Sequence, residues 1–210
     1  MTIAKGVGKR AEKARKTRQK ILAAAGELFV RHGYGTTTLQ DVAAEAGVAV
    51  QTIYFVFGNK RTLVKELVDV TIAGDDADVP TVDRLWFVSA VGADTGAELL
   101  ERLTSGSGEV IARVAPILKV IETAAATDAE LADAWNQDED PRHIVMTHAA
   151  TSLIDKPDAR PGVTVETAAD VMYGLLSPEL YRVMVTTRHW SHDRWAQWTI
   201  ESLTEQLCGD

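Results

Sequence analysis

The chain has 210 residues with an apolar fraction of 46%, which suffices for a sizeable core and excludes a wholly disordered chain. Its formal net charge of −8 argues, taken alone, against a nucleic-acid binder. No apolar run approaches the roughly 20 residues of a membrane helix, and the N-terminus lacks the apolar region of a secretory signal. The single cysteine, Cys208, makes no internal disulfide, which suits a reducing compartment. We therefore expect a cytoplasmic protein without a membrane partner.

Charge is distributed unevenly along the chain. Residues 1–65 contain 12 Lys+Arg and 4 Asp+Glu, a balance of +8, whereas residues 66–210 contain 10 and 26, a balance of −16. This asymmetry is typical of a basic module that faces a polyanion, attached to an acidic body with another role. A basic tail without a specific role would give the same balance, so charge alone leaves both interpretations open.

The N-terminal segment is the most basic part of the chain. Residues 1–16 contain six Lys+Arg and no apolar stripe, so we predict a flexible basic arm there. The cations expected to track DNA are Lys9, Arg10, Lys13, Arg15 and Lys16. A helix is predicted from Thr17 to Gly33, because its apolar residues recur at helical spacing.

Two short helices follow, joined by the sequence AGVA at residues 46–49. The first begins at Thr38, which can cap it, and ends at Gly47, which permits a sharp turn. The second is predicted from about Val50 to Phe57. Such a pair forms a helix-turn-helix, whose second helix can enter a major groove about 12 Å wide. A helical hairpin also occurs in many other α proteins, so this pattern alone does not establish DNA binding.

The rest of the chain keeps a helical pattern, and we find no alternating strand, so the predicted fold class is all-α. Helices are predicted at about 59–74, 84–92, 95–104, 107–126, 128–155, 164–188 and 191–207. Pro116 is expected to mark a kink or a boundary.

Residues 37–69 resemble the DNA-binding segment of the TetR family of transcriptional regulators. The matching positions are Thr38, Val42, Ala43, Ala46, Gly47, Val48, Tyr54, Phe57, Lys60 and Leu63. The resemblance implies an N-terminal three-helix helix-turn-helix DNA-binding domain, here residues 17–60. It also implies a C-terminal helical ligand-binding and dimerisation domain, here residues 61–210.

The resemblance assigns the expected DNA contacts. Gln51 and Thr52 lie where base edges are read, and Val50 or Phe55 could instead touch a thymine methyl. Phosphate contacts are implied at Tyr54, Thr38 and Lys60. The complete predicted DNA-binding set is Thr37, Thr38, Val50, Gln51, Thr52, Tyr54, Phe55 and Lys60. The alternatives are a core role for Tyr54 and a solvated charge for Lys60, whereas Ile53 and Phe57 are expected in the core.

Two positions depart from the family pattern. The family often has Ser where this chain has Ala49, and it often has His or Tyr where this chain has Val56. A missing helix cap costs roughly 1 kcal/mol. We therefore expect a weaker grip on the DNA backbone from this helix, with compensation by the basic arm.

The acidic body is expected to form a homodimer. Two apolar stripes support this, because such helices need more burial than one core face provides. The stripes are Ala168, Val171, Met172, Leu175 and Leu176, and Ala196, Ile200, Leu203 and Leu207. The alternative is that both stripes belong to the internal core.

Candidate ligand-binding residues lie between residues 84 and 155. They are Trp86, Phe87, Trp135, Met146 and His148, which could line a mostly apolar cavity or be ordinary core residues. A small apolar or amphipathic effector is expected. We expect neither a cofactor nor a metal, since the histidine pairs lack ligand spacing, and no enzyme, since no catalytic motif is found.

Together these expectations describe a ligand-responsive repressor that binds a near-palindromic operator in double-stranded DNA as a homodimer. The alternative is a DNA-binding regulator or activator without a small ligand, controlled by a protein partner. A cavity of a few hundred Å³ in the body favours the first, and a closed body favours the second.

Overall fold

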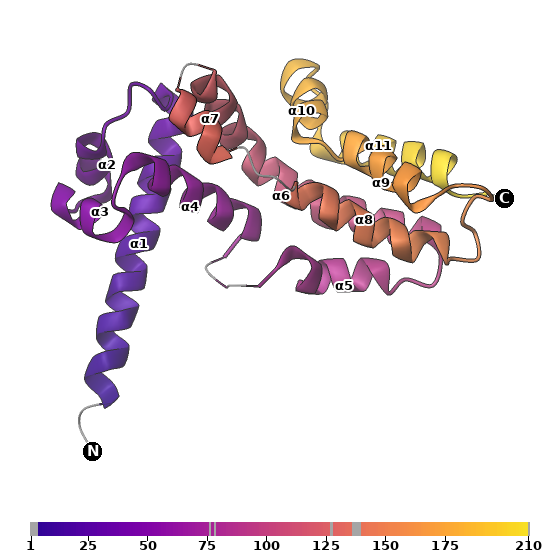
Figure 1. Cartoon of the computed structure of the whole chain (residues 1–210), viewed down its shortest axis with the longest axis horizontal. Coiled ribbons are helices and arrows are strands. Elements are labelled where there is room, and N and C mark those ends of the chain that lie inside the picture. Colours follow the sequence, from indigo (N-terminus) through magenta and orange to yellow (C-terminus); the bar gives the residue numbers. More distant parts are fainter. Residues whose placement is uncertain (1–3, 76, 78, 127, 136–139, 210) are drawn as a thin grey trace. The chain divides into compact units, whose positions relative to one another are not determined.

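The computed structural model describes residues 4–75, 77, 79–126, 128–135 and 140–209, with side chains described from Arg10 onward except those of 133–135. The regular secondary structure of the described residues is helical, with one isolated antiparallel bridge between Ala159 and Cys208 (Figure 1), so the all-α prediction is confirmed. The helices are α1 (Ala4–His32), α2 (Leu39–Ala46), α3 (Val50–Phe57), α4 (Lys60–Ala73), η1 (Thr81–Asp83), α5 (Leu85–Val91), α6 (Gly96–Ala125), α7 (Ala129–Trp135), α8 (Pro141–Ile154), α9 (Val165–Leu175), α10 (Pro178–Tyr181), the π-helical η2 (Arg182–Thr187) and α11 (His192–Leu207). None of these described helices combines the length and the apolar character needed to cross a bilayer.

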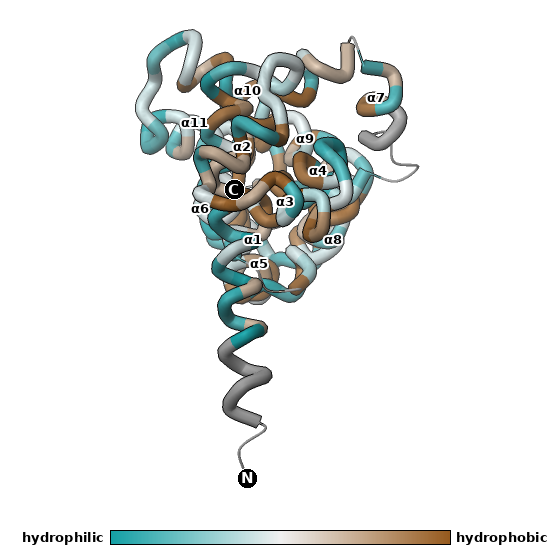
Figure 2. Tube along the Cα trace, turned by 90° about the vertical axis from the view of Figure 1, so that its left-hand side faces the viewer, coloured by the Kyte–Doolittle hydropathy of each residue, from teal (hydrophilic) through white to brown (hydrophobic). Residues whose placement is uncertain are grey.

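Helix α1 is longer than the sequence indicated. It begins at Ala4, so residues 4–16 continue the helix that was expected to start at Thr17. The cause is composition, because Ala, Lys, Arg and Glu are strong helix formers and Glu12 forms an i,i+4 ion pair of 2.9 Å with Lys16. Residues 10–16 are all exposed, and Figure 2 shows largely hydrophilic residues there. The missing apolar stripe therefore indicates that this segment has no core to join, and it does not exclude a helix.

The chain divides into two compact units, which are Met1–Val70 with Pro116–Asn136, and Thr71–Ala115 with Gln137–Asp210. The first unit adds residues 61–70 and the distant segment 116–136 to the expected module of residues 17–60. The chain passes between the units three times, within α4, within α6 and after Asn136. Helix α6 continues through Pro116, whose missing N–H leaves the carbonyl of Ala112 without its helical donor, and the limit between the units falls at this residue.

The core of the first unit joins α1 to the three helices that follow it. Helix α1 packs on α2, and α2 packs on α3. Side chains from α1, α3 and α4 are fully buried, namely Ile21, Ala25, Phe29, Ile53, Leu63 and Val64. At the edge of this core, Arg18 on α1 donates a hydrogen bond of 2.7 Å to Glu66 on α4. These contacts fix α2 and α3 on the C-terminal half of α1.

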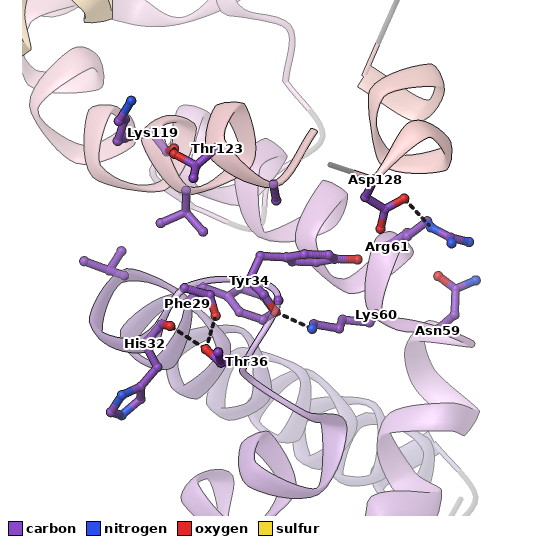
Figure 3. A pocket seen from close by; sticks show the side chains of 15 residues that line it. Phe29, His32, Tyr34, Thr36, Asn59, Lys60, Arg61, Lys119, Thr123 and Asp128 are labelled. Carbon is purple, nitrogen blue, oxygen red and sulfur yellow. Dashed lines mark hydrogen bonds and ion pairs between the residues drawn. The ribbon is translucent and has the colours of Figure 1, made fainter. Parts of the chain in front are cut away.

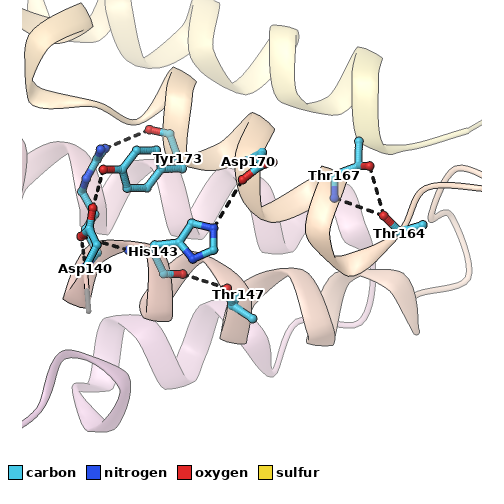
Figure 4. Close-up of polar contacts among 8 residues, drawn as sticks. Asp140, His143, Thr147, Thr164, Thr167, Asp170 and Tyr173 are labelled. Carbon is cyan, nitrogen blue, oxygen red and sulfur yellow. Dashed lines mark hydrogen bonds and ion pairs between the residues drawn. The ribbon is translucent and has the colours of Figure 1, made fainter. Parts of the chain in front are cut away.

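In the second unit α8 pairs with α9, and a polar network joins the two helices (Figure 4). Asp140 caps α8 by accepting from the amide of Arg142 at 2.9 Å, and it also accepts from the Tyr173 hydroxyl on α9. That hydrogen bond raises the pKa of Tyr173. The Arg142 guanidinium donates to the carbonyl of Tyr173 at 2.9 Å and lies 3.4 Å from its ring centroid. His143 and Asp170 add a contact of 3.4 Å further along the same pair.

Helices α6 and α11 run antiparallel in the second unit. A Cβ added to Gly96, at the start of α6, would lie 3.1 Å from the sulfur of Cys208, just after α11. A Cβ added to Gly108 would lie 3.0 Å from the ring of Trp195, in the first turn of α11. Both glycines therefore allow close approach of the helices.

The two predicted dimerisation stripes are partly internal. Ala168, Met172, Leu176, Leu203 and Leu207 are buried within the single chain, since α9 and α11 pack on the core of their own unit. Val171, Leu175, Ala196 and Ile200 are only partly covered. Within the two stripes, only these partly covered residues could contact a second copy of the chain.

Candidate nucleic-acid interface

The turn between α2 and α3 has the geometry that the sequence predicted. Thr38 caps α2 by accepting from the amide of Asp41 at 3.1 Å, and Asp41 accepts in return from the amide of Thr38 at 2.8 Å. The hydrogen bond from the Thr38 hydroxyl is the main cause that lowers the pKa of Asp41. Gly47 ends α2 with φ of 65°, a left-handed conformation that glycine adopts without strain. The capping box and Gly47 therefore fix where α2 starts and stops.

Helix α3 has one buried and one exposed face. Ile53 and Phe57, four residues apart, are 0% and 3% exposed and attach the helix to the unit. Tyr54 and Phe55 are 50% and 91% exposed, and Gln51 is also exposed. The outward face of α3 thus brings together three of the residues predicted to contact DNA.

The other predicted contacts on and before this helix are placed differently. Val50 and Thr52 are half-buried, and Thr38 is exposed at the start of α2. Thr37 is 3% exposed, and its hydroxyl donates to the carbonyl of Gly33 at 2.9 Å, just after α1 ends. Because this hydroxyl is buried and already hydrogen-bonded, Thr37 does not belong to the exposed predicted DNA contacts.

Lys60 is turned into the first unit. Its ammonium donates to the carbonyl of Tyr34 and lies 4.1 Å from the centroid of the Tyr34 ring. Burial lowers the pKa of Lys60 and raises that of the Tyr34 hydroxyl. No sequence pattern indicated this pairing, since the two residues are 26 positions apart.

The two departures from the family pattern are visible in α3. Ala49 stands at the N-cap and makes no side-chain hydrogen bond, while Val56 is half-buried. The exposed cations of α1 offer a basic surface. At about 100° per residue, four of them fall within one arc of about 120° on α1, and Arg15 lies outside it. We call this set the α1 stripe, and it consists of Arg10, Lys13, Lys16 and Lys20.

The structure places the predicted ligand-binding residues in different environments. Phe87 and Met146 are 2% and 4% exposed within the core of the second unit. Trp86 is half-buried and lies against Gly106, His148 is exposed, and the side chain of Trp135 lies outside the described residues. Within the described residues we also find no group of three or more His, Cys, Asp or Glu that could hold a metal.

The capping box gives a direct test of the local geometry. Replacing Thr38 by alanine should lower the free energy of unfolding of the first unit by about 1 kcal/mol, because the amide of Asp41 loses its acceptor. Chemical denaturation followed by circular dichroism measures this change. Gln40→Ala, an exposed change on the same helix, should have almost no effect. An equal effect of both substitutions would contradict the role of the cap.

Comparison with known proteins identifies the helix-turn-helix segment. The family model for bacterial regulatory proteins of the tetR family matches residues 21–67, from α1 through α2 and α3 into α4. The chain is also 25% identical over 174 residues to the uncharacterized HTH-type transcriptional regulator YdeS of Bacillus subtilis (strain 168). That match covers 81% of this chain and 79% of the relative. Residues 21–67 thus carry the DNA-binding segment of the TetR family of bacterial transcriptional regulators.

Further similarities agree with this match. The HTH-type transcriptional regulator TtgR of Pseudomonas putida is 45% identical over 58 residues, 28% of each chain. The SmeT–triclosan complex has a TM-score of 0.72 at 22% identity and covers 92% of each chain. FadR from Bacillus subtilis in complex with stearoyl-CoA has a TM-score of 0.69 at 19% identity, over 88% of this chain and 96% of that chain. At these identities the structural likeness shows a shared TetR-like fold, and the curated relatives are named as regulators and not as enzymes.

Proposed function

We propose that this TetR-family protein is a cytoplasmic, ligand-responsive repressor that binds a near-palindromic operator as a homodimer. The observation that carries the proposal is the outward face of α3, with Phe55 91% exposed beside Gln51 and Tyr54. An aromatic side chain this exposed contributes little to the core, and α3 is the second helix of a helix-turn-helix, the position that enters a major groove.

Each exposed side chain of α3 suits one kind of DNA contact. Gln51 can bond N6 and N7 of adenine, a pair that discriminates between bases by about 1–3 kcal/mol. Phe55 can lie against a thymine methyl. The hydroxyls of Tyr54 and Thr38 can donate to phosphates, which position the helix without specifying sequence.

Selection of binding sites tests this function directly. Full-length protein is used to enrich duplexes from a pool with a randomised centre, and the enriched duplexes are sequenced. We expect two inverted half-sites about 34–36 Å apart or more, bound by two chains as measured by sedimentation. Gln51→Ala should relax the selected sequence at one position of each half-site, whereas Gln197→Ala on α11 should leave the sequence unchanged. An absence of enrichment, or an asymmetric site bound by one chain, would contradict the proposal.

A response to a small effector is supported by the interior of the second unit. Four buried polar atoms have no hydrogen-bond partner among the described residues, and they are Thr104 Oγ1, Ser107 Oγ, Trp195 Nε1 and Thr199 Oγ1. Thr104 and Ser107 lie on α6, and Trp195 and Thr199 lie on α11. Because the two helices run antiparallel, both pairs lie at similar positions along the helix axes. A buried polar group without a partner costs about 1–3 kcal/mol, so this core favours a bound molecule with polar atoms. Two of the structurally similar proteins hold small ligands, triclosan and stearoyl-CoA.

Control by a protein partner remains the second candidate, because two apolar side chains of α5 are exposed. Leu85 is 87% exposed and Val88 is 50% exposed, one helical turn apart. If a protein partner controls the regulator, Leu85→Ser should abolish the partner's effect on operator binding. A purified protein that is released from its operator by a small molecule alone would favour the first candidate.

A further inference from the structure

The first unit contains a pocket of about 770 Å³, and none of the predicted ligand-binding residues is among those that line it. Figure 3 shows it between the last turns of α6 and the end of α1 with the following loop. The first turn of α4 and Asp128, just before α7, complete its wall. Its volume falls within the roughly 300–1,000 Å³ of small-molecule sites, so it can hold a ligand of moderate size.

The wall of the pocket combines an apolar part with an excess of positive charge. Val30 of α1 and Val120 of α6 supply apolar surface, and Val30 is 51% exposed although it is a valine. Three cations and one carboxylate line the pocket, namely Lys60, Arg61, Lys119 and Asp128. The chemistry therefore favours a ligand that is partly apolar and negatively charged.

The carboxylate in the wall is already engaged. Asp128 accepts from the amide of Leu131 at 3.0 Å and lies 4.0 Å from the guanidinium of Arg61. Arg61 also pairs with Glu130. Asp128 and Arg61 thus neutralise one another, and Lys119 pairs with Glu122 at 3.4 Å. The positive charge left for a ligand therefore belongs to Lys60.

Lys60 is the cation best placed to meet an anion inside the pocket. The described contacts use one of its three ammonium N–H groups, in the bond to the carbonyl of Tyr34. The ring of Tyr34 lies beside the ammonium, so a ligand at this point meets a charge next to an apolar surface. Burial disfavours the charged form of Lys60, and an anion beside it would restore that form.

We propose that this pocket binds a small amphipathic organic anion, whose charged group pairs with Lys60 and whose apolar part lies against Val30 and Val120. The site lies within the first unit and is separate from the buried polar atoms of the second unit.

A ligand here would touch the end of α1, the first turn of α4 and the last turns of α6 together. Its effect on operator binding rests on the proposed function, because Lys60 is also a predicted phosphate contact. An anion that holds Lys60 inside the pocket competes with DNA for the same ammonium, so the two ligands should weaken one another by the same factor.

The binding test compares an anionic and a neutral probe on the full-length protein, without DNA. The probes are 8-anilino-1-naphthalenesulfonate and N-phenyl-1-naphthylamine, which share an aromatic scaffold and differ in the sulfonate. Val30→Glu and Val30→Gln have side chains of equal size at an exposed lining position, and only Glu adds a negative charge. Fluorescence titration should give an affinity for the anionic probe roughly fivefold weaker in Val30→Glu than in Val30→Gln. The neutral probe should bind both variants equally.

A second pair of variants tests the volume. Val120→Trp fills the pocket and should weaken both probes at least tenfold, whereas Val183→Trp, at a 48% exposed valine of the second unit, should change neither. Circular dichroism spectra confirm that each variant folds. Equal affinity of the anionic probe for the two Val30 variants would overturn the proposal. So would an equal loss for both probes in Val30→Glu, or unchanged binding in Val120→Trp. Since no DNA is present, these outcomes are independent of the proposed operator binding.

Discussion

Replacing the four cations of the α1 stripe by glutamine should weaken operator binding roughly sixtyfold at 0.1 M salt. The stripe consists of Arg10, Lys13, Lys16 and Lys20, all exposed on a continuous helix. Each phosphate contact contributes about 0.9 to the slope of log affinity against log salt. When two of the four cations are counted as phosphate contacts, their loss lowers the slope by about 1.8, which corresponds to the sixtyfold change between 1 M and 0.1 M salt.

Titration of the selected operator at several salt concentrations measures both the affinity and the slope. Arg15→Gln is the matched control, because Arg15 lies on the same exposed segment but outside the stripe. It should change the slope by much less than the stripe variant. Glu12→Gln removes a carboxylate that pairs with Lys16, so it should strengthen binding. An unchanged slope in the stripe variant would show that α1 does not contact DNA, and that α3 binds without compensation for Ala49 and Val56.

Replacing Thr199 by valine should raise the free energy of unfolding of the second unit by about 1–3 kcal/mol. The side chain is 0% exposed and its hydroxyl has no partner among the described residues. Valine has nearly the same shape, so it fills the same space and removes a desolvated polar atom. Thr104→Val on α6 should act in the same direction, because its hydroxyl is equally buried and unpaired.

The matched control for the threonine series is Thr37→Val. Thr37 is also buried, but its hydroxyl bonds the carbonyl of Gly33, so valine there should destabilise the first unit by about 1 kcal/mol. Denaturation followed by circular dichroism reports both units. Tryptophan fluorescence gives a further signal from the second unit, which contains Trp86, Trp190, Trp195 and Trp198. A loss of stability in Thr199→Val would show that the hydroxyl is satisfied in solution, and would remove the support it gives to an effector site.

The sequence predicted most where local rules decide the outcome. Gly47 and the cap at Thr38 fix α2, and the four-residue spacing of Ile53 and Phe57 defines the buried face of α3, so its exposed face could be predicted as well. The start of α1 was missed because the expectation depended on an apolar stripe, whereas residues 4–16 are helical through their own propensity.

The outcomes that depend on distant contacts could not be predicted. Thr37 and Thr38 are neighbours of the same type, yet one points to the carbonyl of Gly33 and the other caps α2. The inward turn of Lys60 depends on Tyr34, and the pocket depends on a segment of α6 that is far away in sequence. The predicted ligand-binding residues were chosen by side-chain type. Burial in the folded unit, which decides their role, is not a local property.

The interleaved course of the chain has a practical consequence for protein engineering. Residues 116–136 belong to the first unit, and among them Ile117, Ile121 and Leu131 are 4%, 1% and 1% exposed. A fragment that ends after Val70 lacks these side chains, so the apolar surface they cover would meet water. Chimaeras that exchange the DNA-binding module between regulators of this kind should therefore carry the last turns of α6 and α7 together with residues 1–70. A module exchanged as one continuous N-terminal segment would be combined with a foreign α6, and its specificity and stability would be changed together.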